Sequence, residues 1–397
     1  MNTMAETMAE NEFLVDIQHE KLSFFTPAGE VRALNDVTIQ MREGEVLGIV
    51  GESGSGKSVT AYSVMGLTAE NGKITGGSVT FNGHRIDQMT EKELRKIRGK
   101  EVSIIFQDPM TSLNPVWTIG NQIEEAIKLH TDKKGKEATA RARELLTLVG
   151  INEPDKRLKQ YPHELSGGMR QRVMIAIALA CEPKLLIADE PTTALDVTIQ
   201  AQILELMQDL KKKLGMGIIM ITHDLGVVAS MCDHIAVMYA GEIIEYGTTD
   251  DIFYNPQHEY TRGLLRSIPK FHEKDYSRLV PIEGQPVDLL NRPKGCCFAP
   301  RCSNCMKICL EKPPVRNDYE SLGGAAVGEN IHYGRCWLEQ KFAMLGSAEK
   351  QVTSENAAAL ESERAAGAGV AGANAASTGT DADAAGENGG AKQGGEA

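Results

Sequence analysis

The chain has 397 residues, which at about 150 residues per domain is enough for two or three domains. Hydrophobic residues make up 42% and charged residues 24%, a balance typical of a globular protein with a large core. Acidic residues outnumber Lys and Arg by 54 to 42, and the formal net charge of −12 argues against a nucleic-acid partner, which would need a basic surface.

The first residues and the apolar stretches indicate whether the chain is exported or spans a membrane. Residues 1–11 form a polar leader without the apolar segment of a secretory signal. The longest apolar stretches, such as residues 173–181, are far shorter than the roughly 18 residues of a membrane span. We therefore expect a cytoplasmic chain whose work at a membrane goes through partners.

Residues 12–255 alternate short β-branched runs with longer helical patterns, which predicts an α/β domain. The expected strands are 14–18, 45–50, 78–81, 102–106, 185–188, 217–221, 234–239 and 242–246. The expected helices are 57–65, 118–129, 137–149, 167–180 and 197–213. Residues 256–340 are interrupted by prolines and predict a small irregular domain. Residues 341–397 predict a disordered tail, because 12 Ala and 9 Gly fill 21 of the last 33 positions.

A phosphate-binding loop follows the second of these strands. The segment Gly51-Glu-Ser-Gly-Ser-Gly-Lys57-Ser58 matches G-x-x-x-x-G-K-[ST] between a strand and a helix, the context that a P-loop requires. Lys57 would bind the β- and γ-phosphates, and Ser58 would offer its hydroxyl to Mg²⁺. The glycines that let backbone amides turn toward phosphate oxygens are Gly51, Gly54 and Gly56.

Three further strands end in polar residues that suit ATP hydrolysis. Asp189 and Glu190 follow the strand at 185–188, where Asp189 can hold Mg²⁺ and Glu190 can act as general base toward water. Gln107 closes the strand at 102–106, and His223 follows the one at 217–221. Because the carboxyl ends of parallel strands meet at one edge, we expect these residues to lie beside the P-loop.

The segment Leu165-Ser166-Gly167-Gly168-Met169 begins a predicted helix, and with the motifs above it resembles the ATP-binding subunits of ABC transporters over residues 12–270. The resemblance implies a P-loop NTPase nucleotide-binding domain with a RecA-like core, an antiparallel β subdomain and a helical subdomain at about 108–180. It implies catalytic roles for Glu190, Gln107 and His223. Met169 departs from the usual Gln.

The same resemblance implies a set of ligand contacts. The implied nucleotide-binding residues are Phe24 (or Phe25 in its place) on adenine, Gly51, Ser53, Gly54, Ser55, Gly56, Lys57, Ser58, Thr60, Gln107, Asp189, the signature residues Ser166, Gly167 and Gly168, and Asp196 in the segment Ala194-Leu195-Asp196. The implied Mg²⁺ contacts are Ser58, Gln107 and Asp189. In this family the signature binds the ATP held by a second subunit, so we expect two nucleotides between two ATPase subunits.

Three stretches resemble the dipeptide and oligopeptide importer ATPases in particular, namely residues 107–115, 255–269 and 295–302. Glu259 departs from the family's usual Pro. This resemblance implies an ATPase, peripheral to the cytoplasmic face of the cell membrane, that powers peptide uptake. Its implied partners are a second ATPase subunit in a heterodimer, two permeases and an extracytoplasmic binding protein. The alternatives are the same importer machinery with nickel or a glycoside as its cargo, and an ABC ATPase that does not take part in transport.

Six of the eight cysteines lie between residues 296 and 336, and such bunching in a cytosolic chain favours a metal or cluster site over disulfides. The spacing resembles the C-terminal pattern of the peptide importer ATPases. It implies a [4Fe–4S] cluster held by Cys296, Cys302, Cys309 and Cys336. Cys297 and Cys305 are extra, and Cys302-x2-Cys305 leaves a tetrahedral Zn²⁺ site open. Reduced thiols without a metal are the third alternative.

Overall fold

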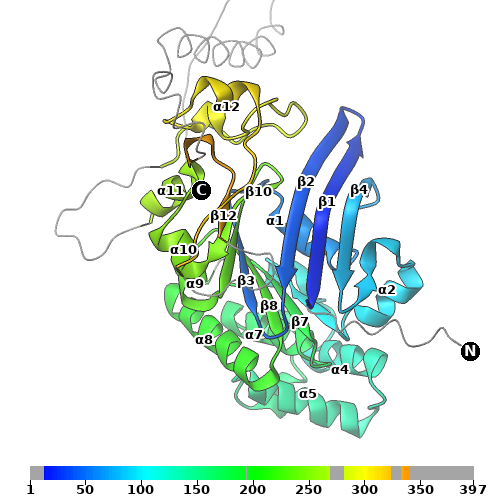
Figure 1. The fold of residues 1–397 in the computed structure, drawn as a ribbon. Coiled ribbons are helices and arrows are strands. Elements are labelled where there is room, and N and C mark those ends of the chain that lie inside the picture. Colours follow the sequence, from blue (N-terminus) through cyan, green and yellow to red (C-terminus); the bar gives the residue numbers. More distant parts are fainter. Residues whose placement is uncertain (1–12, 194, 269–280, 323–331, 340–397) are drawn as a thin grey trace, which may run out of the picture. The chain divides into compact units, whose positions relative to one another are not determined.

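The computed structural model describes residues 13–193, 195–268, 281–322 and 332–339 (Figure 1). The predicted leader at 1–11, the predicted tail at 341–397 and Ala194 lie outside this described part. Its elements belong to one compact unit that ends at Lys350. No helix in the described ranges is long and apolar enough to cross a lipid bilayer.

An eight-stranded sheet forms the centre of the fold, in the order β11-β12-β10-β9-β3-β8-β7-β6. The strands are β3 Val46–Val50, β6 Val102–Ile105, β7 Leu185–Asp189, β8 Gly217–Thr222, β9 His234–Tyr239, β10 Glu242–Thr248, β11 Asn317–Asp318 and β12 Tyr333–Gly334. The five strands from β9 to β6 run parallel, and β10 turns back antiparallel to β9. Every residue of β3, β7 and β8 is buried, as expected for parallel strands covered on both faces.

Alternate residues of β3 point to two different cores. Val46 and Val50 pack with the helices α7 (Gly167–Ala178), α8 (Val197–Leu214) and α9 (Leu225–Met231). Leu47 and Ile49 face α1 (Lys57–Ser63) and the second, antiparallel sheet. The large sheet is therefore the middle layer between helices on one face and α1 with the smaller sheet on the other.

The second sheet has the order β2-β1-β4-β5. Its strands are β1 Val15–Thr26, β2 Gly29–Met41, β4 Gly72–Phe81 and β5 His84–Arg85, followed by the 3-10 turn η1 Ile86–Gln88 and the helix α2 Glu91–Ile97. It forms the antiparallel β subdomain that the family resemblance implies. Its inner face is built from Ile17, Val37 and Phe81, which pack with the large sheet.

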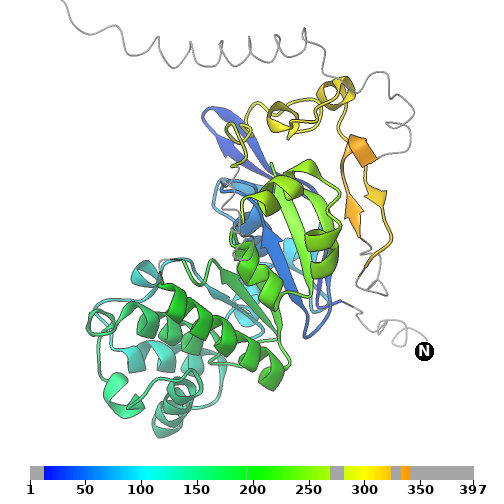
Figure 2. The ribbon, with the colours of Figure 1, turned by 90° about the vertical axis from the view of Figure 1, so that its left-hand side faces the viewer.

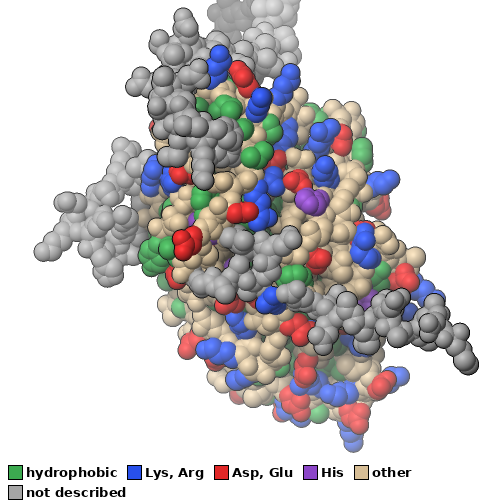
Figure 3. Space-filling model, in the orientation of Figure 1, with side chains coloured by type: hydrophobic (Ala, Val, Ile, Leu, Met, Phe, Trp, Pro, Cys, Tyr) green, Lys and Arg blue, Asp and Glu red, His purple; other side chains and the backbone are tan. Residues whose placement is uncertain are grey.

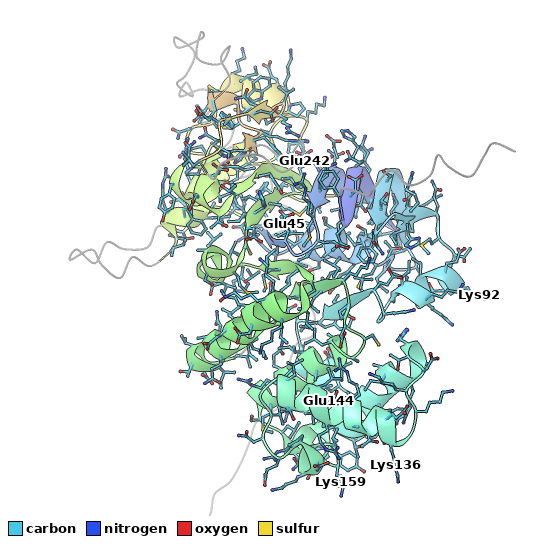
Figure 4. All side chains as sticks on the ribbon, turned by 60° about the horizontal axis from the view of Figure 1, so that its bottom comes forward. Glu45, Lys92, Lys136, Glu144, Lys159 and Glu242 are labelled. Atoms are coloured by element: carbon cyan, nitrogen blue, oxygen red, sulfur yellow. The ribbon has the colours of Figure 1, made fainter. Side chains whose placement is uncertain are left out.

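The helices between β6 and β7 form the helical part of the fold. They are α3 Pro109–Ser112, α4 Ile119–His130, α5 Lys136–Leu148, α6 Pro154–Arg157, the 3-10 turn η2 Pro162–Glu164 and α7. Figure 2 shows this part (cyan to green) gathered away from the blue strands of the antiparallel sheet. Apolar residues on α4, α5 and α7 share one core, while Lys136, Glu144 and Lys159 point outward from it (Figure 4).

The described residues from 256 onward are called the C-terminal region here. It contains α11 Glu259–Arg266, the 3-10 turn η3 Ala299–Arg301, α12 Lys307–Glu311, β11, β12 and the 3-10 turn η4 Trp337–Glu339, and it follows α10 Thr249–Tyr254. It is more regular than predicted. Because β12 pairs with β10 through Tyr246 and Tyr333, the region extends the large sheet. The domain boundaries proposed from the sequence stay a prediction.

Most predicted elements are confirmed with ends shifted by a few residues. However, the expected strand at 14–18 continues to Thr26, the one at 78–81 begins at Gly72, and several elements, among them β2, α2, α9, α10 and α11, were not predicted. Local irregularities explain why the strands of the antiparallel sheet were predicted incompletely. The register of β1 shifts between Ile17 and Glu20, and in β2 Asp36 has a φ of +65°. Both features interrupt the alternation of apolar and polar residues by which strands are predicted.

Candidate functional site

The carboxyl ends of four parallel strands meet at one edge of the large sheet, as the sequence predicted. A cavity of about 240 Å³ opens there, lined by Ser53, Gly54, Gly56, Lys57, Ser58, Val59, Gln107, Asp189 and Glu190. His223 completes the cluster, because its Nδ1 lies 3.3 Å from a carboxylate oxygen of Glu190. The P-loop is therefore surrounded by the polar strand ends that sequence reasoning had assigned to it.

The P-loop needs its glycines for backbone reasons. Gly51 has a φ of +152° and Gly56 a φ of +104°, both in the left-handed range that other residues rarely adopt. A Cβ at Gly51 would lie 2.2 Å from the carbonyl oxygen of Met238, so no side chain fits. The absence of a side chain at Gly51 thus lets the loop lie against β9.

Lys57 is held by the loop's own carbonyl groups. Its Nζ donates to the carbonyl oxygens of Gly51 and Glu52, each at 2.8 Å. Burial lowers the pKa of the Lys57 ammonium, and the negative charges of Glu190, Asp189 and Glu52 partly oppose this change. A phosphate entering the cavity would offer the ammonium a charged partner in place of two neutral ones.

Two of the three side chains expected to hold Mg²⁺, those of Ser58 and Asp189, contact each other, whereas Gln107 donates to Glu190 instead. The Ser58 hydroxyl donates to Asp189 at 3.2 Å, and the Tyr62 hydroxyl donates to the other Asp189 oxygen at 2.6 Å. Hydroxyl and carboxylate oxygens are hard ligands suited to Mg²⁺. Sequence reasoning missed Tyr62, although a residue four positions after Ser58 lies on the same face of a helix. Burial and Asp189 raise the pKa of the Tyr62 hydroxyl.

Glu190 has the most constrained conformation of the cluster. Its φ of +47° is unusual for a residue with a side chain, and its backbone N–H donates to Ile221 at 2.9 Å. One carboxylate oxygen accepts hydrogen bonds from Gln107 at 2.8 Å and from Thr193 at 2.9 Å. His223 faces the other oxygen. Thr193 was not predicted from the sequence, because a lone threonine after the acidic pair gives no signal of its own.

The signature residues do not line the P-loop cavity of their own chain. Ser166 is exposed and caps α7, with its oxygen accepting the N–H of Met169 at 3.4 Å. Gly168 lies so close to α8 that a Cβ would come within 2.8 Å of Ile199. Asp196 is exposed at the start of α8 and accepts the N–H of Ile199 at 2.9 Å. This arrangement leaves the start of α7 open for a ligand held elsewhere.

The remaining implied nucleotide contacts differ in placement. Thr60 is buried and donates to the carbonyl oxygen of Gly56 at 3.1 Å, and Ser55 is buried inside the loop. Phe24 packs partly against the antiparallel sheet beside Gly72, whereas Phe25 is 52% exposed. A role of either phenylalanine on adenine stays a prediction.

Known protein families and curated proteins match this chain over most of its length. The family model described as "ABC transporter" matches residues 34–193, and "Oligopeptide/dipeptide transporter, C-terminal region" matches 244–309. The oligopeptide transport ATP-binding protein OppD of Salmonella typhimurium is 53% identical over 76% of this chain and 90% of its own. OppD of Bacillus subtilis is 55% identical over 82% of this chain and 88% of its own. The chain belongs to the ABC transporter family.

Two other findings refine its place among ABC transporter ATP-binding proteins. The dipeptide transport ATP-binding protein DppD of Bacillus subtilis is 49% identical over 84% of this chain and 96% of its own. A dimeric, post-hydrolysis structure of the ATP-binding cassette MJ0796 bound to ADP and Pi is 30% identical, with a TM-score of 0.54 over 59% of this chain and 98% of that one. The nucleotide-binding domain fold is therefore that of an ABC ATPase.

The C-terminal region of this ABC ATPase brings the four predicted cysteine ligands to one small cavity. Its lining includes Cys296, Cys302, Cys309, Cys336, His258 and Phe298, but not Cys297 or Cys305. All eight cysteines are free thiols, and within the described ranges no group of three or more His, Cys, Asp or Glu is arranged to hold a metal ion. The geometry thus does not support the expected [4Fe–4S] or Zn²⁺ site.

Burial explains the protonation of these thiols. It raises the pKa of Cys302 to about 12 and that of Cys336 to about 11. The pKa of Cys309 is instead lowered, because the neighbouring Cys305 side chain favours its thiolate. The four cysteines that line the cavity carry the ligand type of an iron–sulfur cluster.

Proposed function

We propose that this chain hydrolyses ATP to power an importer of dipeptides and oligopeptides across the cytoplasmic membrane. The observation that carries the ATPase proposal is the placement of Glu190. Its carboxylate faces the P-loop cavity while Gln107, Thr193 and His223 hold it, as a general base requires. The cargo is proposed from the curated relatives, whose names specify oligopeptide and dipeptide transport.

The proposed mechanism assigns a step to each group. The Lys57 ammonium leaves the carbonyls of Gly51 and Glu52 and moves to the phosphates of ATP. Ser58 and Asp189 would hold Mg²⁺, which would neutralise charge on the β- and γ-phosphates. Glu190 takes a proton from water as the water oxygen attacks the γ-phosphorus and the bond to the leaving ADP oxygen breaks. His223 steadies the carboxylate through its other oxygen. Each of these residues lies on or beside the observed cavity.

The exposed signature supports a second ATPase subunit as partner. Because Ser166 lies at the start of α7 and outside its own chain's cavity, its ligand would be the nucleotide of a neighbouring subunit. We propose a heterodimer with a similar subunit, at the cytoplasmic face of the membrane. Two permeases and an extracytoplasmic binding protein complete the assembly.

Exposed apolar residues beyond β6 support permease docking. Phe106 and Trp117 are each 42% exposed and Val116 is 75% exposed, close in sequence to the catalytic Gln107. Such residues usually mark an interface when they lie together on a surface. A permease seated there would sense changes at the γ-phosphate through Gln107.

Uptake by the reconstituted complex tests the proposed function. Proteoliposomes that hold the ATPase pair, the permeases and the binding protein should accumulate a labelled dipeptide or oligopeptide only with internal ATP. The Glu190→Gln complex serves as the inactive control. Uptake of nickel or a glycoside in place of peptides would overturn the cargo, and absence of ATP hydrolysis would overturn the whole proposal.

We also propose a [4Fe–4S] cluster on Cys296, Cys302, Cys309 and Cys336. Its support is the resemblance in spacing and the one cavity that these cysteines line. When bound, such a cluster would cross-link and stabilise a small region with little hydrophobic core of its own. Protein purified without oxygen should contain about four iron atoms and four sulfides per chain. Stoichiometric zinc, or neither metal, would contradict the cluster.

A further inference from the structure

Part of the C-terminal region lies directly against the P-loop. A small cavity is lined by Glu52, Ser53, Gly54 and Ser55 of the P-loop, by Tyr239 and Ala240 at the end of β9, and by Pro286 and Val287 of the C-terminal region. Arg292 reinforces this contact by donating to the carbonyl oxygen of Ala240 at 2.8 Å. The nucleotide-binding loop is therefore backed by residues from beyond the core ABC domain.

Arg301 is the centre of this contact. Its guanidinium forms a two-pronged ion pair with Glu52, with one N–H to oxygen distance of 2.9 Å. The same group donates to the carbonyl oxygens of Ile282 and Glu283 and stacks near the rings of Tyr239 and Phe298. The Arg301 side chain is only 4% exposed. A guanidinium with so many partners is fixed in position and keeps its charge.

Glu52 is correspondingly held at three points. Its carboxylate pairs with Arg301, its backbone N–H donates to the Tyr260 hydroxyl at 2.8 Å, and its carbonyl accepts from Lys57. Two of these three partners belong to the C-terminal region. Glu52 follows Gly51 at the start of the P-loop, so its backbone position decides where the next amides point.

We propose that Arg301 is a positioning residue for ATP binding, which holds the P-loop through Glu52 and neutralises the Glu52 carboxylate beside the phosphate site. The inference rests on the proposed ATPase function. Without Arg301, the free carboxylate would repel the triphosphate and attract the Lys57 ammonium that the phosphates need. ATP binding would weaken, while the hydrolysis machinery around Glu190 would stay in place.

Unequal effects of the two partners test this proposal on the full-length chain. Titration with MgATP should show that Arg301→Gln weakens binding by about fivefold or more, because a charge is left unpaired beside the ligand. Glu52→Gln should weaken binding less than Arg301→Gln, since the Gln amide oxygen can still accept a hydrogen bond from Arg301 and no carboxylate is left unpaired. The double variant should bind MgATP more tightly than Arg301→Gln alone.

Controls separate a lost anchor from a damaged fold. Arg143→Gln removes an exposed ion pair with Asp155 and should bind MgATP as the wild type does. Arg301→Lys keeps the charge and should fall between wild type and Arg301→Gln. In the assembled transporter, Arg301→Gln should raise the KM for ATP and change kcat by less than about twofold.

Several results would overturn the inference. Equal affinity of the wild type and Arg301→Gln for MgATP would show that Arg301 does not support ATP binding. Equal weakening by Arg301→Gln and Glu52→Gln would show that Arg301 does not act by neutralising the Glu52 carboxylate. A loss in kcat with unchanged KM would exclude a role in binding. Failure of the wild type itself to bind MgATP would instead refute the proposed ATPase function.

Discussion

Glu190 is bound by Gln107, Thr193 and His223 and lies in a backbone conformation that few side chains adopt. Three hydrogen-bonding neighbours fix the direction of its carboxylate, and β7 and β8 fix its backbone through Ile221. A general base must point toward the proton that it takes, and these contacts supply that orientation. At the scale of single residues, the site is therefore organised around one carboxylate.

Replacement of this carboxylate should separate ATP binding from hydrolysis. Glu190→Gln keeps the size and hydrogen-bonding capacity of the side chain but removes the base, so we expect a loss of about a hundredfold or more in kcat. MgATP affinity should stay within a few fold of the wild type. Steady-state hydrolysis and equilibrium binding check the two expectations, and unchanged turnover would contradict the assigned base.

A second carboxyl group, Glu20 in β1, should make stability depend on pH. Burial raises its pKa from 4.5 to about 8, with Asp87 adding to the increase and a hydrogen bond from Ser63 opposing it. The folded chain therefore holds a proton that the unfolded chain releases above pH 4.5. This contribution to stability is complete below pH 4.5 and is lost as the pH rises toward 8.

The variant Glu20→Gln should remove that dependence. Its free energy of unfolding should fall less than that of the wild type between pH 5 and pH 8.5, as measured by urea denaturation. Glu91→Gln, at an exposed ion pair, is the matched control. Parallel pH profiles for the wild type and Glu20→Gln would refute a buried, protonated Glu20.

At the scale of elements, the starts of α7 and α8 meet at a glycine. Gly168 lets the start of α7 approach Ile199 on α8, and the two helices begin with capping residues Ser166 and Asp196. The signature and the segment before α8 are thus held together as one unit. Any change in their spacing would move both exposed polar groups.

A larger residue at position 168 should disturb the packing of α7 against α8. Gly168→Val places side-chain atoms where Ile199 lies, so we expect lower thermal stability and loss of ATPase activity in the complex. Adding Ile199→Ala should recover part of the stability. Thermal unfolding of the three proteins decides between a steric effect and a purely chemical one, since the latter would show no recovery.

Sequence reasoning reached the site more fully than the elements around it. The sequence predicts the P-loop, Gln107, Asp189 and Glu190 because each motif is local and follows an apolar strand. Tyr62 and Thr193 were missed, since each acts only through a neighbour that the fold brings close. The strand β2 was missed because Asp36 breaks its pattern, and the contact of Arg301 with Glu52 spans 249 positions that no local pattern connects.

At the scale of the whole molecule, the exposed signature predicts that a single chain does not form a complete site for ATP hydrolysis. Charged side chains of both signs are interspersed over the face in Figure 3, so no single-sign field there opposes association. The start of α7 remains without a nucleotide unless a second subunit supplies one. Activity should therefore depend on assembly.

Light scattering should detect this dependence. The Glu190→Gln chain, mixed with its partner subunit, should associate on adding MgATP and separate when ATP is removed. Ser166→Arg should abolish the association, because a bulky side chain would block the approach of the second nucleotide. A purified single chain that hydrolyses ATP as fast as the complete transporter would contradict the paired arrangement.

The pairing of β12 with β10 has a consequence for synthesis of the chain. Residues 332–334 are made late, yet His332 is fully buried beside Glu245 and Asp251, and Tyr333 stacks on Tyr246. A nascent chain that leaves the ribosome without them has an open strand edge and two acidic groups that lack their histidine. We expect proteases to remove such fragments, so that only a finished polypeptide survives long enough to reach the membrane.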